Sequence, residues 1–151
     1  MSSRRPKVFV SSVHGDFQDT RLNIAEWACD NGYDAWLFEK LGSPSKWAST
    51  TPGDVELVCL DAVANADLYI GLFHRSYGST ARKHFAGISF VDLELFEAFK
   101  EGKPIRCYVL ESAEANPDVV ALLELVKTVV PDRVTVCSSE AKLLETVKRD
   151  I

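Results

Sequence analysis

Five short apolar runs alternate along the chain with five longer segments in which apolar residues recur at helical spacing. The short runs are rich in β-branched and aromatic residues, which is typical of buried strands. The longer segments place apolar residues three and four apart, which is typical of helices that cover a sheet. We expect strands over 7–12, 34–39, 66–73, 103–111 and 133–138. We expect helices over 20–31, 52–65, 116–130 and 140–151, and a further helix that begins at Ser89.

This alternation predicts an α/β domain. Strands joined through helices form right-handed crossovers in a parallel sheet that carries helices on both faces. Five strands in 151 residues favour a three-layer, flavodoxin-like or TIR-like fold with strand order 2-1-3-4-5. The length suits a single domain over residues 1–151, with 1–6 as a flexible tail. In such sheets ligands bind at the carboxyl ends of the strands, where the order reverses between the first and third strands.

Charge and composition argue against several classes of protein. The net charge of −5 disfavours a nucleic-acid partner, and no apolar run approaches the ~18 residues that would cross a membrane. The four cysteines form no C-x-x-C pair, and no histidine lies near them at metal-ligand spacing, so we expect no metal site. Cysteines embedded in apolar runs, and an amino terminus without an apolar segment, favour a reduced, cytoplasmic protein.

Polar residues end the first strand. Ser11 and Ser12 would lie at the expected ligand edge, where hydroxyls and backbone amides can bind phosphate or ribose. The segment lacks the Gly-Lys-Ser/Thr of a phosphate-binding loop and the three glycines of a dinucleotide fingerprint. The alternative is a polar strand end in which Asp16 or Asp19 caps the first helix.

The segment after the third strand supplies a second candidate cluster, Arg75, Tyr77 and Gly78. An arginine beside an aromatic residue can pair with a phosphate while the ring stacks on a base. The alternative is a loop anchored by a buried tyrosine, with Arg75 in solvent. The connection from His74 to Ile88 is the longest polar one after a strand, and loops of this length are often functional.

Glu94 is the acidic residue whose position most favours a chemical role. It follows the capping box of Ser89 and Asp92, and an acid near a helix amino end is electrostatically favoured and stays ionised. Such a carboxylate can stabilise an oxocarbenium ion, or hold ribose hydroxyls, when a glycosidic bond breaks. Glu94, Glu97 and Glu101 also lie three and four residues apart, so the alternative is a solvated acidic helix face.

Several of these segments, in this order, resemble the domain of unknown function 4062 family. That family is similar to TIR domains and to nucleoside 2-deoxyribosyltransferases, and its members often precede STAND-type NTPases, including bacterial defence proteins. In the deoxyribosyltransferases a helix glutamate stands nine residues before the lysine of a Gly-Lys-Pro turn. Glu94 stands nine residues before Lys103, so the resemblance implies that Glu94 is catalytic. The resemblance rests on residues 7–12, 16–17, 21, 39, 66–71, 77–78 and 89–104.

These observations lead to the hypothesis of a TIR-like N-glycosidase that cleaves NAD or a related nucleotide at the N-glycosidic bond. The nucleotide would be a substrate rather than a cofactor. The resemblance further implies a homo-oligomer, or a partner domain of a larger signalling protein, with a role in bacterial defence. The alternative is a non-catalytic module of a STAND-type protein that binds a nucleotide or self-associates. We expect Glu94 to be catalytic and the following residues to bind substrate: Ser11, Ser12, Asp16, Arg75, Tyr77, Gly78 and Ser89.

Overall fold

The computed structural model of the chain describes residues 5–12, 17–37, 60, 62–74, 90–111, 117–129 and 131–151. Residues 60 and 62–65 are helical, at the end of the helix expected over 52–65, and a short 3-10 helix (Pro131–Arg133) precedes the last strand. The other elements follow the predicted alternation of types. They are β1 (Lys7–Ser12), α1 (Gln18–Asp30), β2 (Asp34–Leu37), β3 (Leu68–Phe73), α3 (Phe90–Lys100), β4 (Ile105–Leu110), α4 (Pro117–Val129), β5 (Val134–Cys137) and α5 (Glu140–Asp150).

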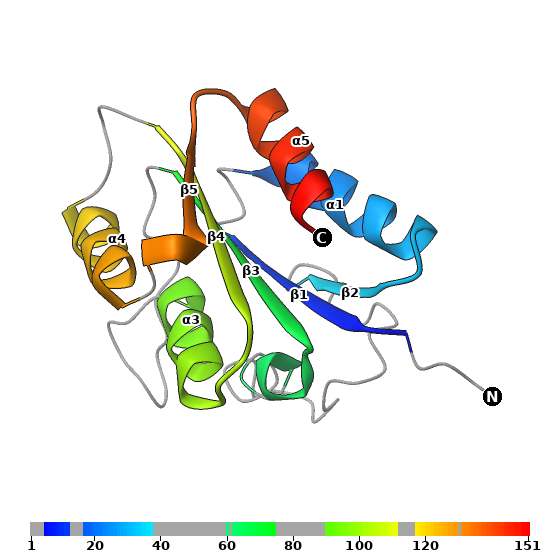
Figure 1. Cartoon of the computed structure of the whole chain (residues 1–151), viewed down its shortest axis with the longest axis horizontal. Coiled ribbons are helices and arrows are strands. Elements are labelled where there is room, and N and C mark those ends of the chain that lie inside the picture. The colour runs from blue at the N-terminus through cyan, green and yellow to red at the C-terminus, as the bar shows by residue number, and fades with distance from the viewer. Residues whose placement is uncertain are drawn as a thin grey trace.

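The five strands form a parallel sheet in the order β2-β1-β3-β4-β5. This order confirms the predicted fold class. Figure 1 shows the strands running side by side through the middle of the molecule. The register places Ser11 of β1 beside Gly71 of β3, and Gly71 beside Cys107 of β4. Because all strands run in the same direction, their carboxyl ends meet at one edge of the sheet.

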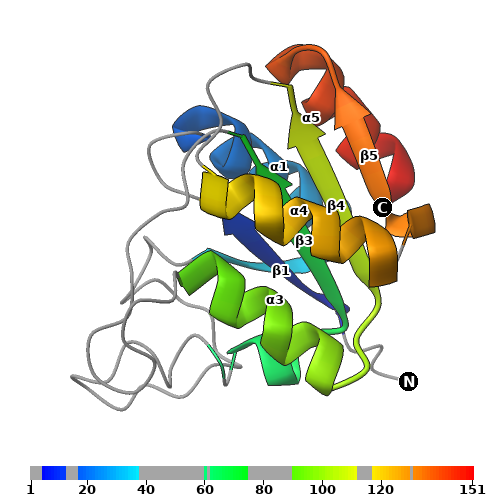
Figure 2. The same ribbon diagram turned by 90° about the vertical axis from the view of Figure 1, so that its left-hand side faces the viewer.

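Helices cover both faces of this sheet (Figures 1 and 2). Side chains alternate between the faces along each strand, so the sheet supports two separate hydrophobic cores. The core under α3 and α4 includes Phe9, Tyr69, Phe73, Leu95, Ala98, Cys107, Leu122 and Val126. The core under α1 and α5 includes Val8, Val10, Ile24, Ile70, Leu72, Tyr108, Leu143 and Val147.

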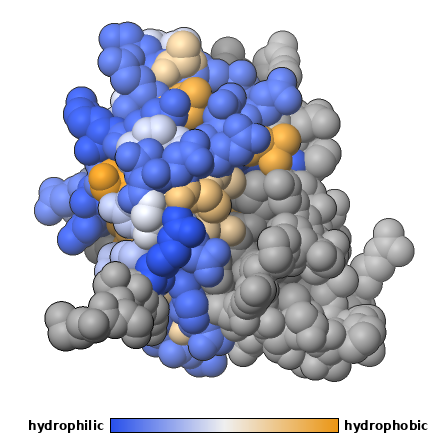
Figure 3. All heavy atoms as spheres, turned by 90° about the vertical axis from the view of Figure 1, so that its right-hand side faces the viewer, coloured by the Kyte–Doolittle hydropathy of each residue, from blue (hydrophilic) through white to orange (hydrophobic). Residues whose placement is uncertain are grey.

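The surface differs from these cores in composition. On the face shown in Figure 3, hydrophilic residues cover most of the described surface and apolar residues form small patches. Within the described ranges, no helix has the length and apolar character needed to cross a membrane.

Two strands begin later than predicted, and the first residue of each expected strand instead closes a helical turn. The strands were expected from positions 66 and 103, whereas β3 begins at Leu68 and β4 at Ile105. The N–H of Ala66 donates to the Val63 carbonyl, and the N–H of Lys103 donates to the Ala98 carbonyl. These bonds close helical turns, so the N–H groups of Ala66 and Lys103 do not pair in the sheet, whereas the N–H of Asp67 already donates to the Lys7 carbonyl.

The start of α1 also differs from the prediction, whereas its end agrees. The N-cap residue is Phe17, which makes no side-chain capping hydrogen bond, and Asp19 lies inside the first turn rather than at the cap. Of the alternative in which Asp16 or Asp19 caps the helix, the part that concerns Asp19 is therefore wrong, and Asp16 lies outside the described residues. The helix ends at the expected Asn31-Gly32 stop, where Gly32 has a φ of 92°, a conformation that favours glycine.

Gly71 provides a first prediction about stability. A Cβ at this position would lie 2.8 Å from Cε2 of Phe73 and 3.1 Å from Cε1 of Tyr69. Both rings are buried in the core, so neither can move aside without disturbing its neighbours. We expect Gly71→Ala to lower the free energy of unfolding by about 1–3 kcal/mol. Urea denaturation measures this loss, and an unchanged midpoint would contradict the packing described for this face.

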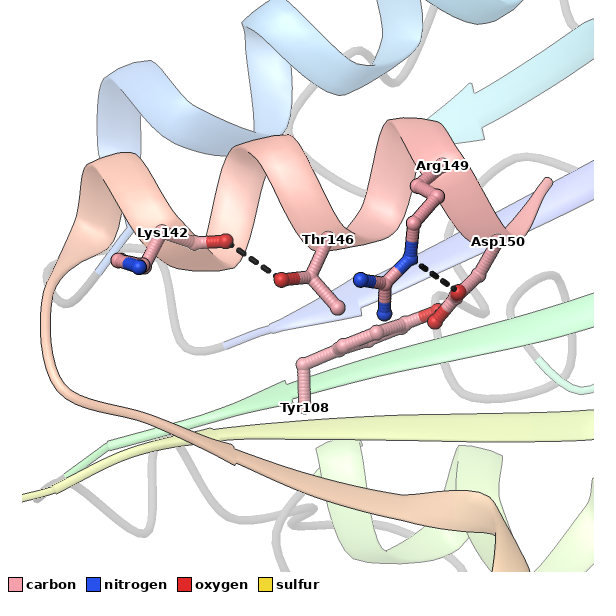
Figure 4. A network of polar contacts seen from close by, with 5 residues as sticks. All are labelled: Tyr108, Lys142, Thr146, Arg149 and Asp150. Atoms are coloured by element: carbon pink, nitrogen blue, oxygen red, sulfur yellow. Dashed lines mark hydrogen bonds and ion pairs between the residues drawn. The ribbon is translucent and has the colours of Figure 1, made fainter.

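The carboxyl end of α5 is fixed to β4 by a buried tyrosine. The Tyr108 hydroxyl donates to Oδ2 of Asp150 at 3.0 Å, and Nε of Arg149 donates to Oδ1 of Asp150 at 3.3 Å (Figure 4). One turn earlier, the Thr146 hydroxyl donates to the Lys142 carbonyl at 2.7 Å. Burial, and then the charge and hydrogen bond of Asp150, raise the pKa of Tyr108. The folded protein therefore favours the neutral phenol.

The raised pKa of Tyr108 predicts a loss of stability in alkaline solution. In the unfolded chain a tyrosine ionises near pH 10, whereas folded Tyr108 keeps its proton to higher pH. Its contribution to stability is therefore complete below about pH 10 and is lost progressively above it. We expect Tyr108→Phe to be less stable at neutral pH and to show a shallower further loss above about pH 10. Chemical denaturation across this range measures both, and equal slopes in the two proteins would contradict the assignment.

Candidate active site

Glu94 is a buried carboxylate in the second turn of α3, with an exposed fraction of 3%. The hydroxyl of Ser11, which lies 83 residues earlier in the chain, donates to Oε1 of Glu94 at 2.9 Å. Ser11 is itself buried, near the carboxyl end of β1. The structure thus brings together two of the predicted site residues at the edge of the sheet where folds of this type bind ligands.

The acidic residues of the α3 stripe have different surroundings. The Glu97 side chain is 14% exposed and lies 3.8 Å from the ammonium group of Lys100, and Glu101 is exposed in the turn after the helix. The interpretation as a solvated acidic face therefore suits Glu101 and is wrong for Glu94. Moving a carboxylate out of water costs several kcal/mol, and charged groups kept inside a protein at such a cost are candidates for function.

Ser11 and Ser12 point to opposite faces of the sheet, because neighbouring residues of a strand alternate. Ser11 shares the α3 face with Phe9, whereas Ser12 shares the α1 face with Val8 and Val10. The Ser12 hydroxyl oxygen is buried and makes no hydrogen bond to any residue that the structure describes. The two hydroxyls therefore cannot hold the same ligand atom, although the sequence placed them at one site.

His74 is a rim residue to which the sequence gave no role. It follows β3 directly, and its Nδ1 lies 2.9 Å from the Leu110 carbonyl oxygen at the end of β4. Because a carbonyl only accepts hydrogen bonds, Nδ1 carries the hydrogen and donates it. The ring also packs at a tilt against Phe17, with centroids 6.1 Å apart. The sequence signal that could have identified His74 as a site residue is its position directly after a buried strand.

A cavity of about 740 Å³ opens at the same edge of the sheet, over β4 and β5. His74 lines it on one side, and Val120, Leu123 and Val136 form part of its apolar wall. Neither Ser11 nor Glu94 lines this cavity. The cavity and the contact between Ser11 and Glu94 are therefore two separate features of this edge of the sheet.

The buried cysteines are poor candidates for a nucleophile. Burial raises the pKa of the Cys107 thiol to about 12 and also raises the pKa of Cys137. A cysteine attacks as the thiolate, so neither of these two is reactive near neutral pH. Among the residues whose positions are described, no group of His, Cys, Asp and Glu could hold a metal ion.

The remaining predicted substrate-binding residues have no described position. The capping box of Ser89 and Asp92 likewise stays a prediction, because Ser89 and the Asp92 side chain are not described. The predicted substrate-binding residues that lie outside the described ranges are Asp16, Arg75, Tyr77, Gly78 and Ser89.

Comparisons with known proteins agree with this fold. A family model described as "Domain of unknown function (DUF4062)" matches residues 7–124. The solved structure of a CMP N-glycosidase from Clostridium botulinum, BcmB, is similar with a TM-score of 0.58 and 13% sequence identity, over 96% of this chain and 99% of that chain. At this identity the likeness shows the fold alone. No curated protein sequence matches the chain.

Proposed function

This chain belongs to the DUF4062 family, and we propose that it is a nucleotide N-glycosidase whose catalytic carboxylate is Glu94. The observation that carries the proposal is the burial of Glu94 at the ligand edge of the sheet, with Ser11 donating to its Oε1 at 2.9 Å. The likeness of the fold to a CMP N-glycosidase supports the same class of reaction.

The reaction breaks the C1′–N bond between a ribose and its base. As this bond lengthens, positive charge develops on C1′ and on the ring oxygen, and an ionised Glu94 beside them stabilises that charge. A water molecule supplies the hydroxyl group that joins C1′. The remaining proton of that water goes to the departing base of a nucleotide such as CMP, and to the solvent when NAD releases neutral nicotinamide. For a nucleoside monophosphate the products are the free base and ribose 5-phosphate.

The surroundings of Glu94 suit this role. The next residue, Leu95, and Ala98 one turn further on are buried in the core, so packing fixes α3 against the sheet. A carboxylate enclosed by protein acts on a nearby positive charge more strongly than one in water, because the effective dielectric constant is lower. Glu94 is therefore oriented before the substrate arrives, and the reaction needs little rearrangement of its surroundings.

Two nucleotides are the first candidates for the substrate. CMP is suggested by the activity named for the structurally similar protein, and NAD by the resemblance to TIR-type enzymes that cleave it. Both contain a ribose joined through nitrogen to a base and carrying a 5′-phosphate. Among the residues that the structure describes, Ser12 is the candidate for binding these nucleotides. Self-association and a cytoplasmic role in defence stay predictions. The other candidate contacts are Asp16, Arg75, Tyr77, Gly78 and Ser89.

Product analysis tests the proposed function. The purified protein, at high concentration, is incubated separately with CMP, deoxycytidine monophosphate, NAD and cytidine, and the products are identified by mass spectrometry. We expect free cytosine with ribose 5-phosphate from CMP, or nicotinamide with ADP-ribose from NAD. Absence of a free base from every compound would contradict the proposal and would favour a non-catalytic module that binds nucleotides.

A further inference from the structure

We propose that Ser11 is a positioning residue for Glu94 rather than a ligand for the substrate. The inference deepens the proposed function and rests on it, since it assigns to Ser11 a part in the same reaction. It also changes the role expected from the sequence, in which Ser11 was a candidate for binding phosphate or ribose.

The hydrogen bond between the two side chains leaves Ser11 little capacity for a ligand. A serine hydroxyl has one hydrogen to donate, and Ser11 donates it to Oε1 of Glu94 at 2.9 Å. Phosphate oxygens accept hydrogen bonds and need donors, so the same hydrogen cannot serve a phosphate at the same time. Ser11 is also buried, and its hydroxyl lies against the Glu94 carboxylate.

The strand residues around this contact carry no charge. On the α3 face of β1 and β3, the positions next to this contact are Phe9, Tyr69, Gly71 and Phe73, and the charged Lys7 lies four residues from Ser11 at the opposite end of β1. On α3 itself, the nearest described charges after Glu94 are Glu97 and Lys100, which approach each other at 3.8 Å. A hydroxyl that donates to a carboxylate favours its ionised form. Ser11 therefore helps to keep Glu94 ionised in a place where burial opposes charge.

The contact also fixes the direction of the carboxylate. Because Ser11 holds Oε1, rotation of the carboxylate plane is restricted. Oε2 of Glu94 then keeps one position relative to the ribose of a bound nucleotide. Small errors in the position of a reacting group cost large factors in rate, up to about a hundredfold for 1 Å. Loss of Ser11 should therefore lower the rate of the chemical step more than it weakens the binding of substrate.

The kinetic test compares Ser11→Ala with the wild type on the nucleotide that is hydrolysed. We expect kcat to fall about tenfold to a hundredfold with KM within about twofold of the wild type. The acid limb of the pH profile should move to higher pH by about one to two units, because loss of the donor raises the pKa of Glu94. Ser11→Thr retains a hydroxyl and is expected to restore most of kcat. A raised KM with unchanged kcat would overturn the inference, because that is the behaviour of a substrate ligand.

A second measurement needs no turnover, so it separates this inference from the proposed function. Glutamate labelled with ¹³C at the side-chain carboxyl is incorporated, the Glu94 signal is assigned by its loss in Glu94→Gln, and it is titrated by NMR. We expect the Glu94 pKa to rise by about one to two units in Ser11→Ala. It should stay constant in Ser12→Ala, because the Ser12 hydroxyl points to the opposite face of the sheet. An equal Glu94 pKa in wild type and Ser11→Ala would overturn the inference, whether or not the protein hydrolyses nucleotides.

Discussion

Replacement of Glu94 by glutamine is expected to lower kcat for nucleotide hydrolysis by at least about a hundredfold. Glutamine has nearly the same shape and keeps an oxygen that can accept the hydrogen bond from Ser11, so the change removes the charge and little else. The neutral amide cannot stabilise the positive charge that develops at C1′. The loss is measured as the rate of release of free base at saturating nucleotide.

A matched control and a stability measurement make this prediction specific. Glu101→Gln removes an equally charged but exposed side chain just beyond α3, and we expect it to retain the wild-type rate. Because an ionised carboxylate is costly to bury, Glu94→Gln should unfold at the same temperature as the wild type or at a higher one. The loss expected for a catalytic charge is at least about a hundredfold. A rate for Glu94→Gln within about threefold of the wild type would therefore show that the charge of Glu94 is not used in catalysis.

The second large effect is expected at Leu143 in α5. This leucine is 0% exposed and lies in the core shared with α1 and the sheet. Leu143→Ala would leave a cavity there and should lower the free energy of unfolding by about 2–5 kcal/mol, a large part of the about 5–15 kcal/mol typical of a domain. Leu125→Ala is the control, because Leu125 is 59% exposed on α4 and should change stability by less than about 0.5 kcal/mol. Urea denaturation measures both.

This result bears on the extent of the domain. The family match ends at residue 124, within α4, whereas β5 pairs with β4 and α5 packs in the core over α1. We expect residues 125–151 to unfold together with the rest of the described chain. Unchanged stability in Leu143→Ala, or a separate transition for α5, would mean that the cooperative unit ends earlier in the sequence.

The fold was predictable because local patterns and chain connectivity agree. Apolar runs such as those of β1 and β3 are recognisable as buried strands, and the alternation with helices leaves few possible orders for a parallel sheet. The errors fall at the ends of helices and strands. There the N–H groups of Ala66 and Lys103 hydrogen-bond to the preceding helical turns, which local sequence patterns do not reveal. The N-cap of α1 is a further error of this kind, because Phe17 and not Asp19 occupies that position.

The candidate site was predictable only in part, because its key contact joins distant residues. The sequence favours Glu94 by its position in the helix and by a resemblance, but Glu94, Glu97 and Glu101 form one stripe in sequence. Only the packing of α3 against the sheet shows that the stripe runs from the interior at Glu94 to solvent at Glu101. The role of Ser11 depends on a hydrogen bond across 83 residues, which no local pattern encodes. His74 was missed because it matches no motif.

The most direct test of the central claim is a crystal structure of Glu94→Gln with an intact nucleotide bound. The account predicts that C1′ of the nucleotide lies about 3–3.5 Å from the side chain at position 94, close enough for a charge there to act on the breaking bond. It also predicts that Ser11 keeps its hydrogen bond to that side chain and makes none to the nucleotide. A nucleotide seated instead in the cavity beside His74, Val120 and Val136, with C1′ remote from position 94, would contradict the account.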